Sequence, residues 1–156
     1  IYIITGKTKS GKSTRLMEWA LTDKIGYREG IIAPVISRKK YLFSTLSNQS
    51  KMLEIQDNKV DNIKIGRYVF DPAVFAWARE QLFLALATSP RFLLIDEIGY
   101  LELKGRGLEP AFSAILNEFE KNKKFSLVLV IRETLLEKIC EFYQLKNYVI
   151  IDDLTQ

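Results

Sequence analysis

The chain has 156 residues, of which 47% are apolar and 27% are charged. This composition excludes disordered, collagen-like and coiled-coil proteins, and we expect one domain, residues 1–156, with a buried core. The single cysteine, Cys140, excludes an intramolecular disulfide, and the lack of histidine excludes any site that needs an imidazole. Acid–base chemistry must therefore use carboxylates, lysine or tyrosine.

The charge is unevenly distributed along the chain. Residues 1–70 carry 13 basic and 6 acidic side chains, whereas residues 71–156 carry 10 and 13. A basic half suits a polyanionic ligand, although a modest lysine excess is more often a solvated surface. No apolar run approaches the roughly 18 residues that span a bilayer, and we expect no signal peptide before the first run. We therefore expect a cytoplasmic protein with no membrane partner.

Strand and helix patterns alternate along the first half of the chain. The apolar run at residues 1–4 predicts a buried strand, and residues 30–36 predict a second one. Between them, apolar residues recur every three or four positions from Ser13, which predicts a helix that Gly26 ends. Short alternating runs in residues 37–70 predict small antiparallel strands.

The alternation continues in the second half. Asp71 and Pro72 predict the start of a helix that runs to about Thr88. Continuous apolar strands that alternate with helices are typical of a parallel sheet covered on both faces. The sequence therefore predicts an α/β fold with a central, mostly parallel sheet flanked by helices and a small antiparallel insertion. The later strands are expected at 92–95, 125–131 and 148–151, and the later helices at 110–121 and 134–142.

The first predicted strand is followed by the motif G-x-x-x-x-G-K-[ST]. Its two glycines allow successive N–H groups to point at phosphate oxygens, and a helix begins near Lys12 with its dipole toward the same anion. Lys12 would neutralise the β- and γ-phosphates, and the Ser13 hydroxyl would complete a Mg²⁺ shell. A lysine-rich turn without a ligand is the alternative. The predicted phosphate-binding residues are Gly6, Lys7, Thr8, Lys9, Ser10, Gly11, Lys12, Ser13 and Thr14.

An acidic pair, Asp96 and Glu97, ends the apolar run that begins at residue 92. We expect Asp96 to bind Mg²⁺ opposite the motif and Glu97 to act as general base for an attacking water. The alternative is that both acids merely end a strand in solvent. A carboxylate directly after the metal aspartate is typical of P-loop ATPases with an extra strand, so strand 125–131 should lie between strands 1–5 and 92–96.

Arg132 follows that inserted strand. In the predicted topology it would face the γ-phosphate, where a cation stabilises transition-state charge. A surface salt bridge with Glu133 or Glu137 is the alternative role for this arginine.

Four segments together resemble a known family. They are residues 6–14, 66–71, 95–103 and 130–132, and they resemble the small P-loop nucleoside-triphosphatases of the thermophile and cancer-related type. The resemblance covers nearly the whole chain. It implies a RecA-like fold and slow Mg²⁺-dependent hydrolysis of several nucleoside triphosphates to diphosphates.

The chain departs from the family pattern at three positions. The family loop usually has proline and glycine where this chain has Lys7 and Thr8, and it often has histidine where this chain has Ile131. These changes leave phosphate and metal binding intact, but they bear on the rate and on base preference.

A few further residues also have candidate roles. Arg67 would reach the phosphates or lie exposed, and Glu102 would orient a neighbouring group or be a solvated loop carboxylate. Tyr68 and Trp77 are expected to be core aromatics, and Cys140 is expected to be inert packing.

Three functions are compatible with these residues. The first is hydrolysis of the β–γ bond of ATP, GTP or a related nucleotide. The second is a nucleotide or small-molecule kinase, for which residues 104–107 are a short candidate lid. The third is a nucleotide-gated binding module that recruits a protein or an RNA, for which the basic and aromatic residues in the segment 38–43 are a candidate single-strand surface.

Overall fold

The computed structural model describes residues 1–7, 9–22, 27–56 and 61–151. Strands and helices alternate at both ends of the chain, and a run of strands lies between the first two helices, as the apolar pattern predicts. Thr8, a predicted phosphate-binding residue, and Gly26, the predicted helix end, lie outside the described residues. The helices are α1 (Lys12–Thr22), α2 (Pro72–Ala87), α3 (Ala111–Asn122) and α4 (Leu136–Phe142), with 3₁₀ turns η1 (Glu102–Lys104) and η2 (Glu133–Leu135).

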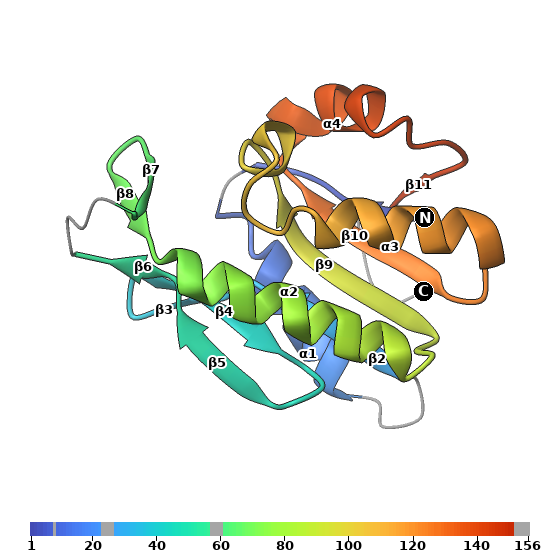
Figure 1. Ribbon diagram of the computed structural model, residues 1–156, viewed down its shortest axis with the longest axis horizontal. Coiled ribbons are helices and arrows are strands. Elements are labelled where there is room, and N and C mark those ends of the chain that lie inside the picture. The colour runs from blue at the N-terminus through green and yellow to red at the C-terminus, as the bar shows by residue number, and fades with distance from the viewer. Residues whose placement is uncertain (8, 23–26, 57–60, 152–156) are drawn as a thin grey trace.

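A central sheet of eight strands organises the described residues (Figure 1). Five strands run parallel in the order β11-β1-β10-β9-β2. The strand expected at 125–131 is β10, and it pairs with β1 on one side and β9 on the other, so its predicted place is confirmed. The strands of this sheet are β1 (Tyr2–Ile4), β2 (Arg28–Ile32), β3 (Val35–Ile36), β4 (Lys39–Ser44), β5 (Gln49–Met52), β9 (Phe92–Ile98), β10 (Ser126–Ile131) and β11 (Val149–Ile151).

The predicted antiparallel insertion, residues 37–70, divides between two sheets. β4 pairs antiparallel with β2, and β3 and β5 pair with β4, so these three strands extend the central sheet. Only the later part forms a separate antiparallel sheet, in the order β6-β8-β7. The antiparallel pairing is confirmed, but the insertion is not one unit, because β4 completes the edge that β2 would otherwise expose. The separate strands are β6 (Glu54–Ile55), β7 (Ile63–Ile65) and β8 (Tyr68–Phe70).

Both faces of the central sheet are buried. Successive residues of the parallel strands alternate between two apolar clusters, because side chains along a strand point to opposite faces. Ile3 and Ile95 belong to the larger cluster, to which α2, α3 and α4 contribute, and Ile4 and Leu94 belong to the smaller one with residues of α1. In Figure 1, α2 and α3 lie in front of the sheet and α1 lies behind it. This two-sided burial explains why the strands read as continuous apolar runs.

A glycine sets the spacing between β2 and β9. Gly30 pairs with Leu94, and a Cβ at Gly30 would lie 2.0 Å from the Leu94 carbonyl oxygen. Its φ of +151° adds a second reason for glycine at this position. Because β2 leads to Ala33 and β9 leads to the acidic pair, this close approach brings the two segments of the site together.

Helix α2 begins as predicted. The Asp71 carboxylate accepts a hydrogen bond of 2.9 Å from the Ala73 N–H, and Pro72 is the first helical residue. Val74 and Leu82 are buried on the side that faces the sheet. Across the described ranges, no helix combines the length and the apolar character needed to cross a membrane.

Candidate active site

The segment between β1 and α1 has the backbone of a phosphate-binding loop. Gly6, Lys9 and Gly11 have φ values of +143°, +63° and +81°. Positive φ values let neighbouring backbone N–H groups point into one concave, anion-binding space. Lys12 is the first residue of α1, so the free N–H groups of the helix N-terminus lie at the same place.

The Lys12 ammonium lies inside this loop. Its Nζ donates to the carbonyl oxygens of Gly6 (3.1 Å) and Lys7 (2.6 Å) and to Ser10 Oγ (3.1 Å). Burial lowers the pKa of Lys12, and the two carboxylates at the end of β9 partly offset this effect. A cation from one end of the chain therefore lies near the acidic pair from the middle of the chain.

Much of the loop surface is accessible to a ligand. Thr14 is exposed on the first turn of α1, and Ser13 is half-buried beneath it. Lys12 is buried and Gly6 is half-buried, whereas the exposed residues of the loop before α1 are Lys7, Lys9, Ser10 and Gly11.

Strand β9 carries a β-bulge at the acidic pair. The register of β9 against β10 shifts between Ile95 and Ile98, and Glu97 has a φ of +63°. In a regular strand, neighbouring side chains point to opposite faces, and a bulge breaks this alternation. Both carboxylates of the bulged segment raise the pKa of Lys12, against the effect of its burial.

Asp96 is almost fully buried, with 1% of its surface exposed. Its Oδ2 accepts a hydrogen bond of 2.9 Å from the Ala33 N–H, whereas its buried Oδ1 has no hydrogen-bond partner among the described residues. Burial and the neighbouring charge of Glu97 raise the pKa of Asp96 to about 6, and the Ser13 side chain and the Ala33 N–H partly offset this shift.

The donor set around Asp96 fits a hard cation. An unpartnered carboxylate oxygen close to the Ser13 hydroxyl is the kind of oxygen pair that Mg²⁺ uses in proteins. Within the described ranges, no three Cys, Asp or Glu side chains gather into a metal cluster. A magnesium ion at this place would therefore take its other ligands from phosphate and water.

Glu97 lies between two cations. Lys40 Nζ donates a hydrogen bond to Oε2, and Arg132 Nη2 lies 3.9 Å from Oε1. The ion pair that the structure gives Arg132 is thus with Glu97, and not with Glu133 or Glu137, the partners considered from the sequence. Arg132 keeps much of its side chain in solvent, at the open side of the acidic pair.

Lys40 is a candidate functional residue that sequence analysis missed. In the sequence it belongs to a basic and aromatic segment, which suggests a surface for single-stranded nucleic acid. In the structure Phe43 of that segment is only 6% exposed and Lys40 is paired with Glu97. The three consecutive basic residues that begin at Arg38 mark this segment in the sequence. No local feature of the sequence, however, predicts that Lys40 pairs with a residue of β9.

Glu102 is buried, so its interpretation as a solvated loop carboxylate is wrong. It is 3% exposed, and its two oxygens accept hydrogen bonds from the N–H groups of Gly99 (2.8 Å) and Leu108 (2.9 Å). Burial raises the pKa of Glu102 to about 7. The carboxylate orders the segment that follows the acidic strand, which agrees with the orienting role.

The aromatic predictions were partly correct. Tyr68 is exposed rather than in the core, because it lies at the start of β8 and its hydroxyl accepts a 3.0 Å hydrogen bond from Arg67, which is also exposed. Trp77 and Cys140 are half-buried and pack against the core, as expected.

The fold and the loop together define a class. A phosphate-binding loop after the central strand β1, with β10 inserted between β1 and the acidic strand β9, is the arrangement of P-loop nucleoside-triphosphatases. The sequence agrees with this class over residues 1–154, which match the family described as NTPase. The chain therefore belongs to the NTPase family, and its substrate class is the nucleoside triphosphates.

Two solved structures share this fold. The crystal structure of THEP1 from the hyperthermophile Aquifex aeolicus has a TM-score of 0.70 and 19% identity, with 99% of this chain and 90% of that chain covered. The solution structure of a human cancer-related nucleoside triphosphatase has a TM-score of 0.67 and 19% identity, with 99% and 88% covered. No curated protein matches the chain. At this identity the likeness concerns the fold.

Proposed function

We propose that this NTPase hydrolyses the β–γ bond of ATP, GTP and related nucleotides to the diphosphate and phosphate, with Mg²⁺ as cofactor. The observation that carries the proposal is the buried Asp96, whose unpartnered Oδ1 lies near Ser13 of the loop and which is followed directly by Glu97. Nucleotide hydrolysis needs a phosphate-binding cation, a metal carboxylate and a water-orienting carboxylate in one place.

The loop would hold the triphosphate through residues 6–14. Lys12 now donates to three neutral oxygens of its own loop. Phosphate oxygens are stronger acceptors for an ammonium than carbonyl oxygens are, so an incoming triphosphate would take over these bonds. The ammonium would then neutralise charge on the β- and γ-phosphates.

Ser13 and Asp96 would hold the magnesium ion. The unpartnered Oδ1 of Asp96 and the nearby Ser13 hydroxyl supply the oxygen ligands for it. When bound, Mg²⁺ supplies positive charge that offsets the charge developing on the phosphates.

Glu97 would orient the attacking water and accept its proton. Lys40 and Arg132 lie on either side of its carboxylate and hold it at the end of β9. Arg132, the more exposed of the two cations, is free to leave this weak contact and stabilise charge on the γ-phosphate.

The test of this assignment is Glu97→Gln. The variant should bind a triphosphate as the wild type does and release phosphate about 10²–10⁴ times more slowly, because the amide cannot take a proton. Glu133→Gln is the matched control, since Glu133 is exposed beside Arg132, and it should leave the rate within about twofold. Wild-type phosphate release by Glu97→Gln would refute the role.

The kinase alternative predicts a different requirement. A kinase consumes nucleotide rapidly only when a phosphoryl acceptor is present. It also closes a lid over the bound substrates. The candidate lid, residues 104–107, is instead tied down, since Arg79 Nη1 donates a 2.7 Å hydrogen bond to the Gly107 carbonyl. Each triphosphate should therefore be incubated with Mg²⁺, with and without phosphoryl acceptors. Acceptor-dependent turnover would favour the kinase, and binding without turnover would favour the nucleotide-gated module.

A further inference from the structure

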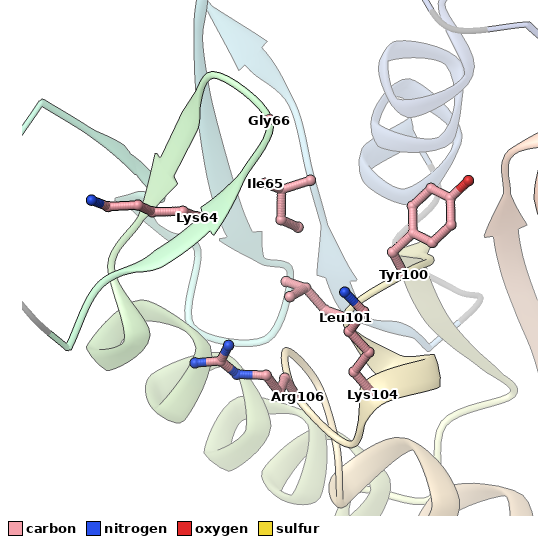
Figure 2. Close-up of a pocket in the computed structure, with 7 residues that line it drawn as sticks. All are labelled: Lys64, Ile65, Gly66, Tyr100, Leu101, Lys104 and Arg106. Atoms are coloured by element: carbon pink, nitrogen blue, oxygen red, sulfur yellow. The ribbon is translucent and has the colours of Figure 1, made fainter.

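A basic cavity lies beside the candidate active site, between the β7–β8 hairpin and the segment that follows β9 (Figure 2). Its volume is about 220 Å³. Figure 2 shows Lys104 rising from the segment after β9 toward Ile65 of the hairpin, whereas Arg106 extends sideways from the same segment. Lys64 also lines the cavity, but it lies on the outer side of the hairpin and its ammonium points away from Lys104 and Arg106.

The described residues that line this cavity carry positive charge only. Its lining includes three cations and no carboxylate. In the part of the chain that the structure describes, Lys64, Lys104 and Arg106 make no ion pair, in contrast to Lys40 and Arg132 near Glu97. Like charges gathered around a concave space create a positive potential there, which favours an anion.

The wall that carries Lys104 and Arg106 is held in place by buried contacts. The Glu102 carboxylate accepts the N–H groups at both ends of the segment, those of Gly99 and Leu108. Gly107 lies so close to this carboxylate that a Cβ there would be 2.3 Å from Glu102 Oε1. The two cations therefore extend from a turn that is already ordered before any ligand binds, which lowers the cost of binding.

The remaining lining residues suit a ring next to the anion. Ile65 and Leu101 give apolar surface next to Lys104, and Tyr100, which is 50% exposed, lies at the edge of the cavity with its ring turned away from the two cations (Figure 2). Aromatic and apolar side chains beside a cationic group are typical of sites for phosphorylated ring compounds. The small volume admits a phosphate group and part of a ring, and is too small to enclose a whole nucleotide.

We propose that this cavity is a second anion site, which binds the phosphate group of a small phosphorylated ring compound such as a nucleoside monophosphate. None of its lining residues belongs to the phosphate loop or to the acidic pair. The proposal does not depend on the hydrolytic reaction, since binding to the cavity is measured directly.

The test is calorimetric titration of the wild-type protein, with the phosphate loop saturated by Mg²⁺ and a non-hydrolysable triphosphate. Adenosine monophosphate should bind, inorganic phosphate should compete with it, and adenosine should bind at least about 10 times more weakly. Lys104→Ala with Arg106→Ala should weaken monophosphate binding about 10- to 100-fold, because two phosphate contacts are lost.

The matched control is Lys121→Ala with Lys124→Ala, which removes two exposed cations at the other end of the sheet. It should change the affinity less than about twofold, which separates local contacts from net charge. The proposal is overturned if both double variants behave alike, if adenosine binds as tightly as its monophosphate, or if a short RNA binds while the monophosphate and phosphate do not.

Discussion

Lys40 Nζ donates a hydrogen bond to Glu97 Oε2 and so joins β4, which pairs with β2, to the end of the acidic strand β9. The two residues are 57 positions apart in the sequence. Both side chains are partly buried, Lys40 more than Glu97, so solvent screens this ion pair less than it would a surface pair. Lys40 is therefore the side chain that holds the proposed water-orienting carboxylate.

Lys40→Ala should lower the rate of phosphate release about 10- to 100-fold with little change in triphosphate affinity, because Glu97 loses its positioning partner. Lys39→Ala is the control, since Lys39 precedes Lys40 on β4 and points to the other face. Lys40→Arg should restore part of the rate, because it restores the charge. Equal rates for the two alanine variants would show that the pair plays no part in turnover.

Asp96→Asn should raise the free energy of unfolding of the free protein by about 1–2 kcal/mol. The asparagine oxygen can still accept from the Ala33 N–H, whereas the buried charge and its unpartnered oxygen are removed. Urea denaturation without nucleotide or metal measures this gain. In melting experiments with a non-hydrolysable triphosphate, Mg²⁺ should raise the Tm of the wild type more than that of the variant. The same Mg²⁺ increment in both proteins would exclude Asp96 as a metal ligand.

The raised pKa of Glu102 predicts a pH dependence of stability. The pKa is about 7 in the folded protein, because burial disfavours the charged form, and 4.5 is its ordinary value. Between these values the folded protein holds a proton that the unfolded chain has lost. The free energy of unfolding should therefore fall as the pH rises from about 4.5 to about 7, by up to about 3 kcal/mol, and then level off.

Urea denaturation across this pH range, in the wild type and in Glu102→Gln, measures the contribution of Glu102. The glutamine cannot titrate, so the difference between the two proteins should change with pH in the direction stated. A difference that stays constant from about pH 5 to about pH 8 would contradict the assignment.

Gly107→Ala should destabilise the protein by about 2–4 kcal/mol, because the new Cβ would overlap Glu102 Oε1 and the Leu101 side chain. Gly105→Ala is a closely matched control. Gly105 has nearly the same φ, +66° against +65°, but nothing lies within 4 Å of a Cβ placed there. That variant should cost about 1 kcal/mol, from backbone strain alone. Equal losses in thermal or urea unfolding would show that the close approach to Glu102 is unimportant.

Local patterns in the sequence determined the order of strands and helices and the main parts of the candidate site. The backbone turn between β1 and α1 was predictable, because Gly6, Gly11 and Lys12 belong to one local strand-to-helix motif. The place of β10 between β1 and β9 followed from the acidic pair Asp96–Glu97, since that pair is typical of one strand order. Helix α2 followed from its N-cap, Asp71, and its first residue, Pro72.

The tertiary structure decided which side chains meet. The charge pair of Lys40 and Glu97, the burial of Glu102 and the exposure of Tyr68 depend on contacts between segments far apart in the chain. The bulge at Asp96 and Glu97 depends on the register between β9 and β10. Backbone preferences and the spacing of apolar residues act over a few neighbouring residues, so they determine the individual helices and strands. Burial and ion pairing act across space, so a sequence pattern does not carry them.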